Sequence, residues 1–192
     1  LQGELSCVMG FGSEAWDRLF GAPRPKNLHP FREINGVHRA VSTPGDILLH
    51  IRAMRPDLCF ELAMHVMDRL GDAVTTEDEV HGFKFFDNRD LLGFVDGTEN
   101  PVPQVAGAAA LVGDEDPDFI GGSYAIVQKY LHDMKGWNAQ PVERQETIIG
   151  RFKLSDIEMK DEAKAPYAHN VLTNIDGENG EQLQIVRDNM PF

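Results

Sequence analysis

The feature that most constrains the fold is a polar, turn-rich tract at residues 87–103, near the middle of the chain. The tract is rich in Asp, Asn, Gly and Pro, and only a few apolar residues interrupt it. Because these residue types favour turns and end helices and strands, the tract predicts a junction between two folded halves. Each half mixes strand-like and helix-like segments, which predicts an α+β fold with helices on one face of an antiparallel sheet.

Apolar periodicity predicts the individual elements. A helix is expected after Pro56, because apolar residues recur there at every fourth position: Leu58, Leu62, Val66 and Leu70. Asp57 is the expected N-cap of this helix, and Gly71 ends it. The other expected elements are strands at 5–11, 46–53, 121–130 and 183–187, strand-like stretches within 75–86, and helices at 13–20, with Ser13 as N-cap, and 138–150. The centre of 46–53 is apolar on both faces, so we place this strand inside a sheet.

The charge balance narrows the classes of partner. The chain has 192 residues, with 18 Lys and Arg against 31 Asp and Glu, and a formal net charge of −13. Phosphate binding depends on clustered cations, so this balance argues against nucleic acid, and it disfavours anionic membrane surfaces. No apolar run approaches the roughly 20 residues that cross a bilayer, which predicts a soluble protein.

Cysteine usage and the chain ends give further expectations. Cys7 and Cys59 lie in apolar sequence and are expected to be buried free thiols, which fits a reducing cytoplasm. The first residues lack an initiator Met, a basic region and a long apolar run, so they do not form a signal peptide. A strand-like pattern runs into Pro191 at the other end. We therefore expect a fragment whose first strand and last elements are absent.

Asp96 is the first residue with potential chemistry. It lies between apolar residues and a Gly-Thr turn in the segment Gly93–Gly97, where burial would raise the pKa of its carboxyl and a nearby cation would lower it. Such a carboxyl can exchange protons. The alternative is an Asp that only accepts hydrogen bonds from its own turn, and the short pattern does not separate the two.

Histidine spacing excludes one kind of site and leaves another open. The chain has seven His residues, at positions 29, 38, 50, 65, 81, 132 and 169. They lack the short paired spacings of a zinc centre. A site that needs one imidazole, such as the axial ligand of haem iron, remains possible, because the porphyrin supplies the other four donors. Taken alone, any of these His residues is more often a hydrogen-bonded structural residue than a ligand.

Arg187 ends a strand-like pattern and raises a similar choice. Alternation places it on the same face as Leu183 and Ile185. Its guanidinium therefore either extends to solvent, which is the default, or points into a cavity that needs a fixed positive charge.

Several separated segments together resemble one family, the dye-decolourising peroxidases of the bacterial type B. The segment Gly93–Gly97 matches the family's GxxDG motif, and Thr98, Asn100 and Pro101 extend the match. Further segments that look like the family are 81–86, 121–124, 149–151 and 185–192. Their order and spacing agree along nearly the whole chain.

The resemblance implies two ferredoxin-like units with antiparallel sheets and outer helices. It assigns 1–90 to the first half, 91–115 to a distal loop and linker, and 116–192 to the second half, which would hold one haem b per chain. His169 resembles the proximal ligand of the haem iron. Asp96 resembles the distal carboxylate and Arg187 the distal guanidinium, both also in contact with the cofactor, and Asn189 resembles a neighbouring polar residue.

The function implied is a haem peroxidase that reduces hydrogen peroxide and oxidises phenolic, dye-like or similar one-electron donors through a ferryl intermediate. One alternative is a haem-binding or porphyrin-handling protein on the same scaffold without strong turnover. Another is a structural or cargo role in which the scaffold only forms oligomers. The resemblance also implies a homo-oligomer, with an encapsulating shell protein as a possible partner.

Overall fold

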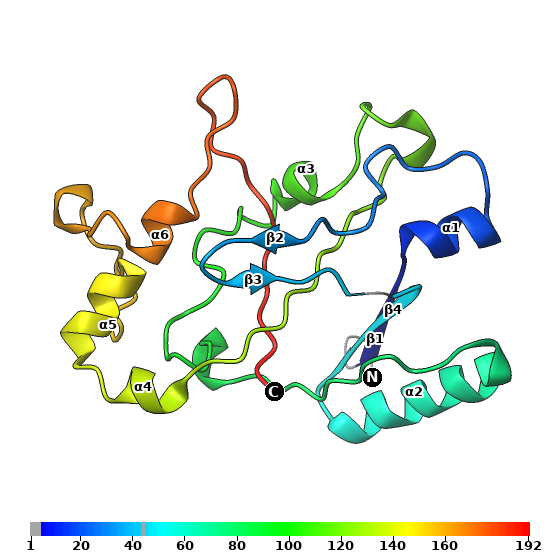
Figure 1. Cartoon of the computed structure of the whole chain (residues 1–192), viewed down its shortest axis with the longest axis horizontal. Helices are drawn as coiled ribbons and strands as arrows, with labels where there is room; N and C mark the ends of the chain where they lie inside the picture. Colours follow the sequence, from blue (N-terminus) through cyan, green and yellow to red (C-terminus); the bar gives the residue numbers. More distant parts are fainter. Residues whose placement is uncertain (1–4, 44) are drawn as a thin grey trace. The chain divides into compact units, whose positions relative to one another are not determined.

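A computed structural model describes residues 5–43 and 45–192 (Figure 1). The chain forms two compact units. The first contains the residues up to Glu79 together with Val112–Ala125, and the second contains Val80–Leu111 and Ile126–Phe192. In the described part of the chain, no helix is long and apolar enough to cross a membrane.

The first unit contains both sheets of the described residues. Its elements, in chain order, are β1 (Leu5–Phe11), α1 (Ser13–Leu19), β2 (Ile34–Asn35), β3 (Arg39–Ala40), β4 (Ile47–Ala53), α2 (Pro56–Leu70) and the 3₁₀ helices η1 (Gly71–Ala73) and η3 (Pro117–Phe119). Strand β1 pairs antiparallel with β4, and the short β2 pairs antiparallel with β3. The fold is thus α+β with small antiparallel sheets, as the mixed pattern of the sequence predicts.

Strand β4 lies in a two-stranded sheet, so the prediction that it is interior to a sheet is wrong for the described residues. Leu5 pairs with Ala53 and Phe11 with Ile47 at the two ends of the β1–β4 ladder. Along β4 half-buried and exposed side chains alternate, which is the pattern of a sheet covered on one face. Apolar residues on both faces of β4 therefore do not require both faces to be buried.

Helix α2 confirms the expected stripe. Its half-buried residues are those of the apolar stripe and their neighbours: Leu58, Cys59, Leu62, Ala63, Val66, Met67 and Leu70. The helix contacts β4, where the Cys59 Sγ lies 3.9 Å from the Ile51 carbonyl oxygen. Its N-cap is Arg55 and Pro56 follows, so the prediction that Asp57 caps it is wrong. The Asp57 carboxylate instead pairs with the Arg55 guanidinium.

Aromatic rings cluster around α1 in the first unit. The Trp16 ring lies 4.7 Å from the Phe20 ring and 5.6 Å from the Phe119 ring, centroid to centroid. The N-cap of α1 is Gly12 rather than Ser13. Both cysteines are free, but Cys7 is exposed on the less covered strand β1, which corrects the expectation that it is buried.

The second unit is built from short helices and extended segments. Its elements are η2 (Phe86–Asn88), α3 (Ala106–Ala110), α4 (Met134–Asn138), α5 (Val142–Ile149), η4 (Asp161–Ala163) and α6 (His169–Leu172). The helix expected at 138–150 begins only at Val142, because Pro141 lacks an N–H and disfavours helical backbone at the residue before it. Helix α5 still ends at Gly150, as expected.

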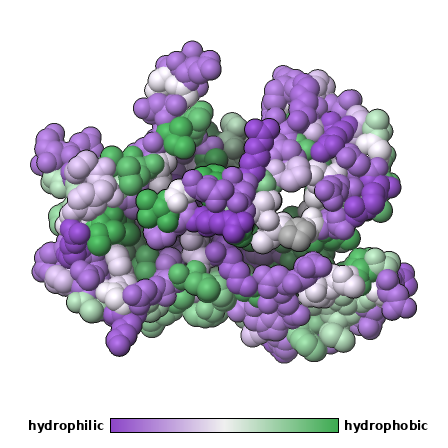
Figure 2. Space-filling view, viewed as in Figure 1, coloured by the Kyte–Doolittle hydropathy of each residue, from purple (hydrophilic) through white to green (hydrophobic). Residues whose placement is uncertain are grey.

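Residues 75–86, 121–130 and 183–187 form no strand in the described part of the chain, which corrects three strand predictions. An apolar alternation indicates which face of a strand would be buried, but it does not provide a partner strand. Large apolar side chains consequently stay exposed there: Ile126, Val127, Tyr130, Leu183 and Ile185. Figure 2 shows apolar residues spread among polar ones on the visible face of the molecule.

The end of α5 is tied to the start of α6. Gly150 adopts a left-handed conformation, with φ of 88°, and its N–H donates to the Glu146 carbonyl at 2.7 Å. The Asn170 amide on α6 donates to the Gly150 carbonyl at 3.0 Å and to the Glu158 carboxylate at 2.9 Å. A Cβ at Gly150 would collide with the Asn170 Oδ1, so this contact requires glycine.

We predict that Gly150→Ala destabilises the protein more than Gly180→Ala. Both glycines have positive φ, so each alanine adds backbone strain of about 1 kcal/mol, but nothing lies within 4 Å of a Cβ at Gly180. At Gly150 the displaced Asn170 adds about 1–3 kcal/mol. Urea unfolding of the two variants measures the difference, and equal losses would show that the α5–α6 contact contributes nothing.

Candidate functional site

Asp96 lies at the end of a tight hairpin of residues 88–96. The Asp90 N–H donates to the Phe94 carbonyl at 2.8 Å, and the Phe94 N–H donates to the Asp90 carboxylate at 3.0 Å. The Asp96 N–H closes the hairpin by donating to the Asn88 carbonyl at 3.0 Å. Gly93 at the tip has φ of 92°, a conformation that side chains disfavour. The turn residues of the sequence thus fold into a defined support for Asp96.

Arg89 joins this hairpin to the segment after α5. Its guanidinium donates to the Gly93 carbonyl at 2.8 Å and to the Lys153 carbonyl at 2.7 Å. One charged group therefore satisfies carbonyls of two segments that lie far apart in sequence. Hydrogen bonds from a guanidinium are strong and geometrically specific.

Phe94 anchors the hairpin in the core of the second unit. It is 3% exposed, and its ring meets the Trp137 ring edge-on at 6.2 Å between centroids. The Lys153 Nζ lies 5.5 Å from the centre of the Phe94 ring and donates to the buried Gln145 Oε1 at 2.6 Å. Because Phe94 is two residues before Asp96, its burial limits how far Asp96 can move.

Asp96 and Arg187 line one cavity of about 400 Å³. Its lining residues are Asn88, Asp96, Gly97, Asn100, Val186, Arg187 and Asp188. Arg187 is exposed, which fits the default alternative from the sequence, and the residue also lines the cavity. The cavity lining therefore contains one permanent cation, Arg187, and two carboxyls, those of Asp96 and Asp188.

Burial raises the pKa of the Asp96 carboxyl above its usual value, and the negative charges of Asp90 and Asp188 act in the same direction. The backbone N–H of Gly97 and the Arg187 guanidinium lower the pKa but do not cancel the rise. Asp96 is thus influenced by the main chain of its own turn and also lines the cavity. Its higher pKa makes it a better proton acceptor than an exposed aspartate once it is ionised.

Asn189 follows Arg187 by two residues and is half-buried. Its amide Nδ2 is buried and makes no hydrogen bond to any described residue. A buried donor without a partner costs about 1–3 kcal/mol, so such a group in a stable site usually serves a ligand or water. The cavity-lining residues do not include Asn189.

His169 lies apart from this cavity. It is the first residue of α6, it is exposed, and it is not among the residues that line the cavity with Asp96. The preceding residue, Ala168, is completely buried and anchors the start of the helix. No described residue makes a hydrogen bond to the imidazole of His169. The structure thus brings Asp96 and Arg187 together and holds His169 on a separate element of the same unit.

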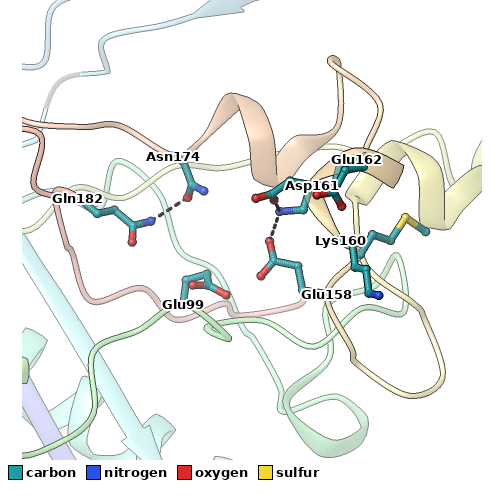
Figure 3. Close-up of a pocket in the computed structure, with 9 residues that line it drawn as sticks. Glu99, Glu158, Lys160, Asp161, Glu162, Asn174 and Gln182 are labelled. Carbon is teal, nitrogen blue, oxygen red and sulfur yellow. Dashed lines mark hydrogen bonds and ion pairs between the residues drawn. The ribbon is translucent and has the colours of Figure 1, made fainter.

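A second, more polar cavity of about 550 Å³ was not anticipated from the sequence (Figure 3). Glu99, Glu158, Asp161 and Glu162 contribute carboxylates to its lining. The Lys164 Nζ lies 2.6 Å from the Glu158 carboxylate and 2.8 Å from that of Asp161. In Figure 3 these two contacts are the dashed lines that converge between Asp161 and Glu158. The signal in the sequence that could have indicated this cavity is the cluster of acidic residues around Lys160.

Two family models together match almost the whole chain. The model described as Dyp-type peroxidase, N-terminal, matches residues 2–84, and the model described as Dyp-type peroxidase, C-terminal, matches residues 87–192. The break between the matches falls at the start of the turn-rich tract.

Individual proteins agree with the family models. A dye-decolorizing peroxidase of Rhodococcus erythropolis is 62% identical over 99% of this chain and 56% of its own length. A variant of Rhodococcus jostii DypB in complex with haem has a TM-score of 0.95 at 55% identity, over 99% of this chain and 62% of that one. An encapsulated DyP-type peroxidase of Mycobacterium smegmatis has a TM-score of 0.94 at 57% identity, over 98% of this chain and 61% of that one.

More distant relatives carry a different name. A deferrochelatase of Escherichia coli is 30% identical over 78% of this chain and 40% of its own length. The chain spans a little over half the length of the peroxidases that it matches. From the two family models and the high identities, this chain belongs to the Dyp-type peroxidase family.

Proposed function

We propose that this chain contains the haem-binding and peroxide-activating part of a dye-decolourising peroxidase. The observation that carries the proposal is the cavity that Asp96 and Arg187 both line, with the charge of Arg187 acting on the Asp96 carboxyl. A base and a fixed cation in one cavity fit the reduction of hydrogen peroxide, which needs proton transfer and stabilisation of negative charge. Family membership and the haem-bound relative support the same activity.

The residues of the second unit fit a haem b. The His169 imidazole is exposed and has no hydrogen-bond partner among the described residues, so it is available as an axial ligand. The unpaired Asn189 Nδ2 and the charged Arg187 provide donors for a second, separate set of contacts. In this assignment His169 holds the iron, and Arg187 and Asp96 also contact the cofactor. The haem would supply the redox-active iron at which peroxide is reduced.

Asp96 moves the proton in this scheme. It would take a proton from one oxygen of hydrogen peroxide and deliver it to the other oxygen, which leaves as water, directly or through a water molecule. Only the ionised carboxylate can accept the first proton. The raised pKa of Asp96 therefore places the acid loss of activity at higher pH than an ordinary aspartate would, and activity rises as pH increases through that pKa.

Arg187 and Asn189 act without changing their protonation state. The guanidinium stays charged at all working pH values, so it stabilises the negative charge that develops on peroxide as the proton leaves. The Asn189 amide holds a water or a peroxide oxygen through its unpaired Nδ2.

Relatives support the broader assignments. The names of the peroxidases favour dyes as substrates, and the encapsulated relative favours a shell protein as a partner. Phenolic and similar one-electron donors stay predictions. Three further expectations stay predictions. They are the homo-oligomer, the cytoplasmic location, and the division into two ferredoxin-like units at 1–90 and 116–192 joined by 91–115. The match of separate N-terminal and C-terminal models supports a division into two halves.

A haem-binding or porphyrin-handling role is the second candidate, and the deferrochelatase relatives support it. The peroxidase relatives are about twice as similar in sequence, at 55–62% identity. A distal base and cation are also unnecessary for haem storage. Consumption of hydrogen peroxide by the haem-loaded protein separates the two roles.

We predict that His169→Ala abolishes stoichiometric haem binding, because the axial imidazole is lost. The pyridine haemochromogen assay gives the bound haem per chain after loading and gel filtration. His65→Ala is the matched control, since His65 is exposed on α2 and pairs only with Glu61 among the described residues. Full haem content with an unchanged imidazole-ligated spectrum in His169→Ala would refute the assignment.

We predict that Arg187→Leu slows the reaction of the haem-loaded protein with peroxide more than Asp96→Ala does. Loss of a preorganised charge costs on the order of 10²-fold in rate, whereas water can replace part of the proton transfer by Asp96. Stopped-flow rates across pH measure both variants, and Asp96→Ala should also lose the acid limb of the pH profile. An inactive Asp96→Ala beside a normal Arg187→Leu would show that the two roles are reversed.

A further inference from the structure

Asn100 makes two hydrogen bonds to the main chain of a single residue, Arg187. Its amide Nδ2 donates to the Arg187 carbonyl at 2.6 Å, and its Oδ1 accepts from the Arg187 N–H at 2.8 Å. Both polar groups of one side chain therefore satisfy both backbone groups of one residue. Paired bonds of this kind fix position and direction together, as one rung of a sheet does.

A tight turn presents the Asn100 amide to Arg187. The Asn100 N–H donates to the Gly97 carbonyl at 3.0 Å, which closes the turn directly after Asp96. Gly97 has φ of 72°, and a Cβ there would lie 2.7 Å from the Asn100 Nδ2 and 3.5 Å from the Arg187 carbonyl oxygen. Glycine is thus required at this position by backbone conformation and by the space that the amide occupies.

The turn links Asp96 to Arg187 by a short path. The Asp96 N–H is held by the Asn88 carbonyl, and four residues later the Asn100 amide holds Arg187. Asn100 itself is half-buried and lines the same cavity. The segment that carries Arg187 belongs to no strand, so strand pairing does not set its distance from Asp96.

We propose that Asn100 is a positioning residue whose amide holds the Arg187 backbone so that Arg187 stays in the cavity that Asp96 also lines. The effect on turnover rests on the proposed function, but the position of Arg187 does not. Without the amide, Arg187 keeps its charge and loses its fixed place in the cavity. An exposed arginine on an extended segment then spreads over many rotamers.

The Asp96 carboxyl reports where Arg187 lies. The charged groups that act on it are Asp90, Arg187 and Asp188, and Arg187 is the one that lowers its pKa. Displacement of the guanidinium removes this opposing effect while the two carboxylates stay in place. The pKa of Asp96 should therefore rise, and the acid limb of the pH–rate profile should move to higher pH.

The test compares Asn100→Ala, Arg187→Leu and the double variant in the full chain. Infrared difference spectra across pH follow the protonation of Asp96, with Asp96→Asn identifying its carboxyl band. We expect Asn100→Ala to move the titration in the same direction as Arg187→Leu, and the double variant to move it no further than Arg187→Leu. The rate with peroxide should fall roughly 10- to 100-fold in Asn100→Ala, the size expected for a misplaced group.

Asn174→Ala is the matched control. Asn174 is exposed and accepts a hydrogen bond from the Gln182 side chain, away from the Asp96 cavity. It should leave the Asp96 titration unchanged. An Asn100→Ala protein with a lower melting temperature and an unshifted Asp96 titration would overturn the proposal, because Asn100 would then be only structural.

Two further results keep the test decisive. In the unmodified chain, hydrogen exchange at the Arg187 N–H should be slowed by its bond to Asn100, and exchange at the rate of a free amide would overturn the proposal even if the variant fails to fold. The infrared titration requires neither haem nor turnover. A shifted titration in a protein without peroxidase activity would therefore support the role of Asn100 and reject the proposed function.

Discussion

Burial of Phe94 fixes the hairpin on which the candidate site depends. Among the described residues, the buried hydrophobic ones are Ala15, Phe94, Val112 and Ala168. Phe94 is two residues from Asp96, and Ala168 is adjacent to His169. The apolar contacts that hold the second unit together thus lie next to the residues with potential chemistry. Full burial of a phenylalanine is worth about 1.5–3 kcal/mol, which is enough to keep a turn-rich segment in one conformation.

Hydrogen bonds to main-chain groups complete the site. Arg89 joins the Asp96 hairpin to the segment after α5, and Asn100 joins the following turn to Arg187. Asn170 in turn joins α6, which begins at His169, to the end of α5. Side chains that bond to carbonyls and N–H groups of other segments take the place of sheet pairing in this unit. The geometry of the candidate site and the stability of this unit consequently depend on the same three side chains, Arg89, Asn100 and Asn170.

The sequence predicts elements well where one segment contains the whole signal. The stripe of α2 and the glycine that ends α5 are both visible in the sequence and are confirmed by the structure. The prediction of strands at 121–130 and 183–187 is wrong, because a strand also needs a partner strand that its own pattern does not identify. The predicted burial of Cys7 is wrong for a related reason, since burial depends on what covers β1.

The candidate site shows the same limit. Motif resemblance selected Asp96, Arg187, Asn189 and His169, and the structure places the first two in one cavity, while the four roles stay predictions. Arg89 and Asn100 were not selected as site residues, since a bond to a distant backbone group leaves no periodicity in the sequence. Asn100 was quoted only as part of the motif. Its partner, Arg187, is 87 residues away along the chain.

The most direct test of the account is the absorption spectrum of the haem-loaded protein before and after one equivalent of hydrogen peroxide. The account predicts a Soret band of imidazole-ligated ferric haem that changes on addition of peroxide and returns when a phenolic donor is added. A chain that binds haem but whose spectrum is unaltered by peroxide would contradict it, because Asp96 and Arg187 would then not activate peroxide.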